Sequence, residues 1–308
     1  MRNEPLCTRR ALLGAGVCLG AAPAALAQEP SLSFLVIGDW GEHSDGEVAV
    51  AGAMARVAAE LNTAFVVSTG DNFYSSGVES VDDPQWTETF EQVFSAASLQ
   101  TPWYAVLGNH DYRGSVAAEM NYTIQSPRWR MPARYWQQDF AAADGGASFF
   151  FLDTFPLTHL PLLRARVPVL GDSAGAHAQL AWLERALASS PARWKFVVGH
   201  HPIVSSGAHG GAPALYHHVR PLLLRYGVAA YFNGHDHDLE YLRDGRLSYI
   251  CSGAGSEVRR LRRARPQSVF GYDGGVGFAS CSIAGATMQL RFHGGDGAEL
   301  YASTLAIA

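Results

Sequence analysis

Five short polar segments carry the residues that could do chemistry, and each follows a run of apolar residues. Their side chains are mainly aspartate, asparagine and histidine, the oxygen and imidazole ligands of first-row metal ions. Buried polar groups of this kind are costly unless something binds them, so packing alone explains five such segments poorly. The segments are Gly38-Asp39-Trp40-Gly41, Gly70-Asp71-Asn72-Phe73-Tyr74, Gly108-Asn109-His110-Asp111, Gly199-His200-His201-Pro202 and Gly234-His235-Asp236-His237.

The last of these segments suggests how many ions are held. His235 and His237 are two residues apart, so an extended backbone points both imidazoles to one side. This spacing favours two neighbouring ions over one. Two metals roughly 3.5–4 Å apart can hold a bridging hydroxide and clamp a phosphate for in-line attack.

The elements that must position these segments are strands. Continuous apolar runs without alternation are typical of a sheet that is covered on both faces. The carboxyl ends of such strands meet at one edge, where open α/β sheets bind ligands. The runs are Phe34 to Ile37, Phe65 to Val67, Trp103 to Leu107, Phe149 to Leu152, Phe196 to Val198 and Ala229 to Phe232.

Three stretches between the strands have the amphipathic spacing of helices: Glu47 to Leu61, Ala176 to Ala188 and Ala214 to Tyr226. From Leu239 onward the pattern changes to short strands and Gly-rich turns. We therefore predict one α/β domain with sheets flanked by helices, ending in a β-rich half. The span from Arg113 to Arg134 fits neither period and predicts a long excursion over the site.

The N-terminus has the composition of an export signal. Arg9 and Arg10 precede an apolar stretch, and Ala25-Leu26-Ala27 offers the small residues that a signal peptidase reads. The paired arginines resemble a twin-arginine signal. We predict that residues 1–27 are cleaved and that residues 28–308 form a single exported domain, periplasmic or secreted. The apolar stretch is too short to favour a lasting membrane span.

The composition excludes some classes of partner. The 308 residues are 48% hydrophobic and 17% charged, which is ordinary for a globular protein. A formal net charge of −5 provides no basic face for nucleic acid. Arg259-Arg260 with Arg262-Arg263 is a short basic patch, and we expect a solvated loop there.

Two cysteines, Cys251 and Cys281, remain after the predicted signal, and both lie in strand-like runs. Export to an oxidising compartment would permit a disulfide between them. Two free buried thiols fit the pattern equally well, since strand cysteines pack as small apolar residues.

The five segments resemble those of the calcineurin-like metallophosphoesterase superfamily, and within it the small purple acid phosphatases of the tartrate-resistant type. The similarity covers nearly all of residues 32–305, including residues 88–94 and 252–255. Most of the superfamily has Asp-x-His in the first segment, whereas this chain has Gly41 in place of the histidine. Purple acid phosphatases share that substitution and supply a tyrosine from the second segment, here Tyr74. The resemblance implies a four-layer α/β/β/α sandwich with the metal site at the C-terminal strand ends.

The resemblance also assigns ligands to two ions. The first ion takes Asp39, Asp71, Tyr74 and His237, and the second takes Asp71, Asn109, His200 and His235, so that Asp71 bridges. The first set is rich in anionic oxygens, which favour the more highly charged ion. We therefore expect Fe(III) at the Tyr74 site, divalent Fe, Zn or Mn at the Asn109 site, and a purple colour. His110 and His209 match the family's outer histidines, which bind phosphate oxygens and protonate the leaving group.

These residues predict an exported acid phosphatase that hydrolyses small phosphate monoesters with a metal-activated hydroxide. One alternative is a phosphodiesterase or nucleotide-cleaving metallophosphoesterase that uses Mn or Zn. Another is a non-catalytic phosphate- or metal-binding protein, against which His110 argues because a pure binder needs no proton donor. Asp111 either orients His110 or makes a simple turn contact, and we expect Asp236 and Asp238 to face solvent or steady their neighbours.

Overall fold

The computed structural model describes residues 32–142, 145–161 and 173–307. The predicted export signal, residues 1–27, lies outside this part of the chain. The division of the chain after residue 27 therefore stays a prediction. Among the described residues, no helix is long and apolar enough to span a membrane.

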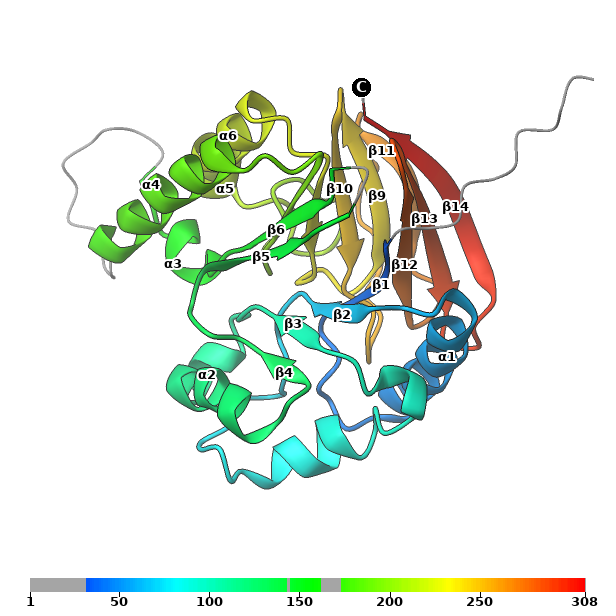
Figure 1. The fold of residues 1–308 in the computed structure, drawn as a ribbon. Coiled ribbons are helices and arrows are strands. Elements are labelled where there is room, and N and C mark those ends of the chain that lie inside the picture. The colour runs from blue at the N-terminus through cyan, green and yellow to red at the C-terminus, as the bar shows by residue number, and fades with distance from the viewer. Residues whose placement is uncertain (1–31, 143–144, 162–172, 308) are drawn as a thin grey trace, which may run out of the picture.

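The described residues form two seven-stranded sheets. The first sheet contains β1 (Leu32–Ile37), β2 (Phe65–Ser68), β3 (Trp103–Ala105), β4 (Trp129–Arg130), β12 (Gly277–Ala284), β13 (Thr287–Gly294) and β14 (Glu299–Ala306). Its strand order is β14-β13-β12-β1-β2-β3-β4, as Figure 1 shows. The strands β1 to β4 run parallel, whereas β12 to β14 join as antiparallel neighbours.

The second sheet has the order β11-β9-β10-β8-β7-β6-β5. Its strands are β5 (Trp136–Phe140), β6 (Ala147–Phe151), β7 (Trp194–Val198), β8 (Ala230–Asn233), β9 (Leu239–Asp244), β10 (Leu247–Ser252) and β11 (Ser268–Tyr272). The central strands β6, β7, β8 and β10 are parallel to their neighbours in that series. The β-rich half predicted from Leu239 onward is confirmed as β9 to β14.

Alternation along each buried strand divides the apolar side chains between two cores. In β1, Phe34 and Val36 enter the core between the two sheets, where Phe34 meets Phe149 at 5.2 Å between ring centroids. Leu35 and Ile37 on the same strand point into the opposite core, beneath a helix. Both faces of the sheet are therefore covered, as the continuous apolar runs predict.

Helices cover the outer face of each sheet (Figure 1). On the first sheet, α1 (Asp45–Leu61) contacts β1 and β12. It begins at Ser44, whose hydroxyl accepts a hydrogen bond from the Glu47 amide, and ends at Asn62 in the left-handed conformation. On the second sheet lie α3 (Thr154–Thr158), α4 (Ser173–Ser189), α5 (Pro213–His218) and α6 (Arg220–Arg225), which share a third apolar core with β6 and β7. The four-layer α/β/β/α sandwich is confirmed.

Two local predictions are wrong. The helix expected over Ala214 to Tyr226 is two short helices, α5 and α6, because Pro221 has no N–H with which to continue the first one. The span from Arg113 to Arg134 contains α2 (Val116–Gln125) and β4 rather than an irregular excursion. The buried polar Glu119 interrupts the apolar face of α2, which hid the helical period. Short helical turns precede it at Trp86–Glu91, Ala97–Leu99 and Asp111–Arg113.

The two cysteines lie in different sheets, Cys251 in β10 and Cys281 in β12. Both are buried and unpaired. Of the two alternatives that the sequence left open, the structure has free buried thiols.

Candidate metal centre

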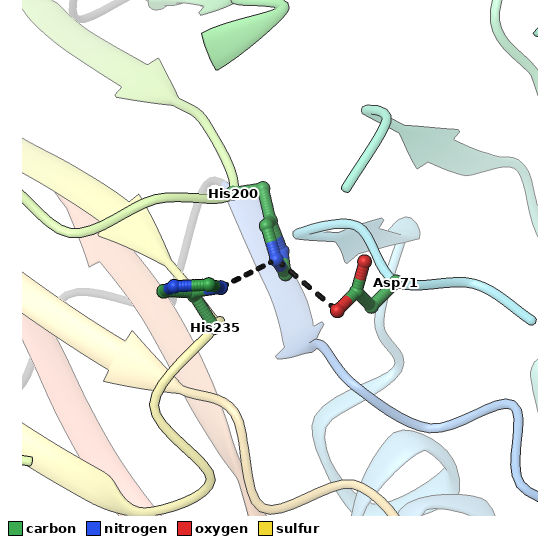
Figure 2. Close-up of side chains that lie close together, drawn as sticks. All are labelled: Asp71, His200 and His235. Atoms are coloured by element: carbon green, nitrogen blue, oxygen red, sulfur yellow. Dashed lines mark hydrogen bonds and ion pairs between the residues drawn. The ribbon is translucent and has the colours of Figure 1, made fainter. Parts of the chain in front are cut away.

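The five polar segments meet where the parallel strands of both sheets end. Asp39 follows β1, Asp71 follows β2 and Asn109 follows β3 of the first sheet. His200 follows β7 and His235 follows β8 of the second sheet. Figure 2 shows Asp71, His200 and His235 converging from these separate strand ends. The predicted convergence at one edge is therefore present.

Three of these residues have a left-handed backbone conformation. The φ angles are 56° at Asp39, 50° at Asp71 and 70° at His235. For a residue with a side chain this conformation costs roughly 1–2 kcal/mol. Hydrogen bonds hold it in place: the Asp39 carboxylate accepts from the His235 amide at 2.9 Å, and Asp71 accepts from the His110 amide at 2.7 Å. Strain that is kept in this way is typical of functional sites.

One group of possible metal-ligand atoms surrounds the Tyr74 hydroxyl. Its Oη lies 3.1 Å from Asp39 Oδ1, 3.0 Å from Asp71 Oδ2 and 3.2 Å from His237 Nε2. A single hydroxyl proton cannot satisfy all of these partners. First-row ions hold oxygen and nitrogen ligands at about 2.0–2.2 Å, a distance that places neighbouring ligand atoms roughly 3 Å apart. The Tyr74 group therefore fits one cation.

A second group surrounds His200 Nε2. This atom lies 3.1 Å from Asn109 Oδ1 and 3.2 Å from His235 Nδ1. Figure 2 marks the contact between His200 and His235 with a dashed line. The other ring nitrogen, Nδ1, lies 3.0 Å from the Thr69 carbonyl, which can only accept. Nδ1 therefore carries a proton, and the lone pair of Nε2 is available to a metal. Ligand atoms of Asp71, His200 and His235 all lie within 4.8 Å of one another.

Asp71 belongs to both groups. Its Oδ2 atom is 3.0 Å from the Tyr74 hydroxyl and 3.3 Å from His200 Nε2. The carboxylate is 2% exposed, so water does not screen it. Asp71 thus occupies the position that a bridging ligand requires.

The charges of the cluster call for a cation. Burial, reinforced by Asp71, raises the pKa of Asp39. Burial also opposes the charged form of Asp71, but His200 and His110 outweigh it and lower the pKa of Asp71. Burial and both carboxylates raise the pKa of the Tyr74 hydroxyl, whereas Asp71 and Asp39 overcome burial and raise the pKa of His200 to about 9. A bound metal ion would take the place of the proton on His200 and would lower the pKa of each ligand that it binds.

The two outer histidines flank opposite sides of the cluster. The ring of His110 lies 4.4 Å from that of Tyr74, and its Nδ1 is 2.9 Å from the Ser75 carbonyl. The ring of His209 lies 4.5 Å from that of His235. All nine residues predicted for the site are therefore gathered around one cluster.

Asp111 makes the turn contact rather than orienting His110. Its carboxylate accepts from the amides of Asn72 at 2.9 Å, Phe73 at 3.3 Å and Gly108 at 2.7 Å. These bonds clamp the second polar segment to the third. The Asn72 side chain adds bonds to Asp111 at 3.2 Å and to Glu119 at 3.0 Å.

Asp236 and Asp238 are both buried, so of the two alternatives that the sequence left open, facing solvent is wrong. Asp236 accepts from the amides of His209 at 2.7 Å and Gly210 at 3.1 Å, and it therefore steadies the loop that carries His209.

Sequence reasoning missed two residues, Glu257 and Arg259. Glu257 Oε2 lies 3.4 Å from His237 Nδ1, the ring nitrogen away from the Tyr74 group. Arg259 Nη1 lies 3.0 Å from His209 Nε2. No spacing rule would have found either contact, because the loop that holds them is distant in sequence from the segments it reaches.

Comparisons with known proteins agree with this geometry. The family model described as calcineurin-like phosphoesterase matches residues 32–239. Human tartrate-resistant acid phosphatase type 5 is 36% identical over 296 residues, covering 90% of this chain and 91% of that protein. Purple acid phosphatase 3 of Arabidopsis thaliana is 37% identical over 277 residues, covering 85% and 74%. Among solved structures, GAP50, the anchor in the inner membrane complex of Plasmodium, has a TM-score of 0.80 at 26% identity, covering 90% of this chain and 89% of GAP50.

Proposed function

We infer the function from the family: the chain belongs to the calcineurin-like metallophosphoesterases, and within them to the tartrate-resistant type of purple acid phosphatase, so it is a metal-dependent phosphatase. We propose that it is an exported acid phosphatase that hydrolyses small phosphate monoesters with a dinuclear Fe(III)–M(II) centre. Export rests on the paired arginines of residues 1–27, with residues 28–308 as the single exported domain.

The observation that carries this proposal is the position of the Tyr74 hydroxyl. It lies within 3.2 Å of Asp39, Asp71 and His237, beside the segment where Gly41 replaces a histidine ligand. A phenolate and two carboxylates are hard anionic ligands, which favour a trivalent ion. Asn109, His200 and His235 add only neutral donors, which suits a divalent partner such as Fe, Zn or Mn. Asp71 would be shared by both ions.

The bound metals would lower the pKa of a water molecule to form the hydroxide nucleophile. The protein's own residues perform the remaining tasks. The Thr69 carbonyl sets the tautomer of His200, so the lone pair of Nε2 and the Oδ1 atom of Asn109, 3.1 Å apart, would both be available to the same ion. The amide of His110 fixes Asp71, so the same residue positions the bridging carboxylate and presents its ring beside Tyr74.

His110 is the proposed general acid. The Ser75 carbonyl holds a proton on His110 Nδ1, so Nε2 is directed away from that contact; in the imidazolium form Nε2 carries the second proton, which the leaving alkoxide would take. His209, on the His235 side, would bind a phosphate oxygen. The two histidines then hold the phosphate from opposite sides.

The non-catalytic alternative has one structural parallel, because GAP50 is named as an anchor and has the same fold. The nine residues gathered around the cluster favour catalysis instead, since a binding protein has no use for His110.

The proposal is tested on protein purified without added metal. We expect about two metal ions per chain including iron, a broad visible absorption band, and hydrolysis of p-nitrophenyl phosphate at acid pH. An active, iron-replete protein without colour would overturn the ferric tyrosinate site. Absence of phosphatase activity in the fully metal-loaded protein would overturn the function itself.

A further inference from the structure

The basic patch expected to be a solvated loop reaches the metal centre. Five arginines stand within residues 259–265, which we call the arginine loop: Arg259, Arg260, Arg262, Arg263 and Arg265. The loop connects β10 to β11. In a chain of net charge −5 it is a local concentration of positive charge.

The backbone of the arginine loop is held at several points. The Arg259 amide donates to the His237 carbonyl at 2.8 Å, and the Arg262 amide donates to the Ser206 carbonyl at 2.9 Å. The Leu261 amide donates to Asp273 at 3.0 Å. An ordered loop loses less conformational entropy when a ligand binds. The arginine loop is therefore better prepared for an anion than a free solvated loop.

Arg259 is the member of the loop that borders the site. Its Nη1 is 3.0 Å from His209 Nε2, and the His209 ring lies 4.5 Å from that of His235. Its Nη2 is 3.4 Å from Glu257, a long and partly exposed contact. The guanidinium has five N–H donors in a planar fork, so several stay available to a ligand. The Arg259 side chain is 39% exposed, which leaves it accessible to a ligand.

Three other arginines of the loop line two hollows, neither of which includes Arg259 or a residue of the metal cluster. Arg262 and Arg263 line one of about 300 Å³, and Arg265 lines another of about 400 Å³. The acidic groups that act on Arg259 are Glu257 and Glu42. Glu257 also lies 3.4 Å from His237, so its charge is shared between two partners.

We propose that Arg259 binds a second phosphate of the substrate, so that the enzyme prefers phosphomonoesters with another phosphate close to the one hydrolysed. This inference rests on the proposed function of the site. One phosphate occupies the metal cluster between His110 and His209, and the neighbouring phosphate meets the guanidinium beyond His209. Arginine and phosphate form charge-assisted, often bidentate hydrogen bonds, which are about twice as strong as neutral ones.

The test measures binding apart from turnover. The metal-loaded protein is titrated by calorimetry with orthophosphate and with methylenediphosphonate, a diphosphate analogue that is not hydrolysed. We expect Arg259→Gln to weaken methylenediphosphonate binding at least ~10-fold, the usual effect of losing one hydrogen bond to a charged group. Orthophosphate binding should weaken less than ~3-fold, because the single phosphate does not reach Arg259. Arg259→Lys, which keeps the charge without the fork, should fall between the two.

The matched control is Arg260→Gln, an exposed neighbour in the same loop. It should change neither dissociation constant by more than ~2-fold, as expected of a solvated charge. Equal weakening of both ligands by Arg259→Gln, or no weakening, would overturn the inference while leaving the phosphatase function intact. A wild-type protein that binds both ligands but hydrolyses no p-nitrophenyl phosphate would overturn the function, and the two affinities would still decide the role of Arg259.

Discussion

The two halves of the metal cluster differ in charge much more than in geometry. Around Tyr74, donor atoms lie 3.0–3.2 Å from a hydroxyl that sits between two carboxylates. Around His200, donor atoms lie 3.1–3.3 Å from an imidazole nitrogen, and only Asp71 among them is anionic. Under the proposed function, similar spacing with different charge would let each half select its own ion through the chemistry of its ligands. The halves share Asp71 and can otherwise be altered separately.

Removing the shared carboxylate should have the largest effect. Asp71→Asn keeps an acceptor for the His110 amide but removes the charge common to both halves. We expect metal content to fall in both sites and kcat to fall by about 10³-fold, the upper end for losing one electrostatic stabiliser. Metal analysis and p-nitrophenyl phosphate kinetics measure this. Asp139→Asn on β5 is the control and should keep both its metal content and its kcat. An Asp71→Asn protein that still binds metal fully in both sites would contradict the proposal that both ions share Asp71.

Substitutions of His110 and His209 test whether leaving-group protonation and phosphate binding belong to different halves of the cluster. His110 packs beside Tyr74, whereas His209 packs beside His235. We expect His110→Ala to lower kcat at least ~100-fold at unchanged metal content, because a general acid is lost. His209→Ala should lower kcat/KM only about 10-fold, as for one hydrogen bond to a charged oxygen. Equal losses would show that the leaving group is not protonated from the Tyr74 side alone.

Substituting a ligand in one half at a time should separate loss of the visible absorption band from loss of ion binding. Tyr74→Phe removes only the hydroxyl, so we expect the visible band to vanish and activity to fall about 10-fold through weaker ion binding. Asn109→Ala should lower activity to a similar degree and keep the band. Visible spectra of iron-loaded protein measure both. Tyr112→Phe, whose hydroxyl contacts Asp153 outside the cluster, is the control; a coloured Tyr74→Phe protein would remove the phenolate from the proposal.

The last prediction concerns stability rather than activity, and it tests Glu47, a buried carboxylate outside the metal cluster. Burial raises the pKa of Glu47 to about 8, whereas His200 and His110 lower that of Asp71. Folded Glu47 therefore stays protonated above its unfolded pKa near 4.5, and the protein loses stability as pH rises from 5 to 8. In Glu47→Gln this loss should be smaller by on the order of 3 kcal/mol. Urea unfolding at pH 5 and pH 8 measures it, and identical pH dependence in both proteins would refute the shift.

The sequence predicted the metal ligands at the strand ends better than it predicted the loop residues that contact them. Asp39, Asp71 and Asn109 end apolar runs, so strand ends could be read directly from the sequence. Tyr74 required the family resemblance, because a loop aromatic by itself is typical of packing. Arg259 could not be found, since its contact with His209 spans 50 residues. Local patterns carry no information about which distant loop will cover a site.

The helix α2, which the sequence did not predict, and the predicted helix that is divided into α5 and α6 show that local patterns also fail over short segments. The apolar pattern of Ala214 to Tyr226 suits one helix, yet Pro221 divides it. In α2 the buried Glu119 bonds to Asn72, so a polar residue takes a core position for a reason outside the helix. Each error arose where a single residue outweighed the average of its neighbours.

The Asp111 clamp bears on the order of events when the enzyme is made. Its carboxylate binds amides from the second and third segments, and none of these bonds uses an atom of a proposed metal ligand. These two segments would therefore be joined whether or not metal is bound. The amides of Asn72, Phe73 and Gly108 would then exchange slowly with deuterium in the chelated protein as well as in the loaded one.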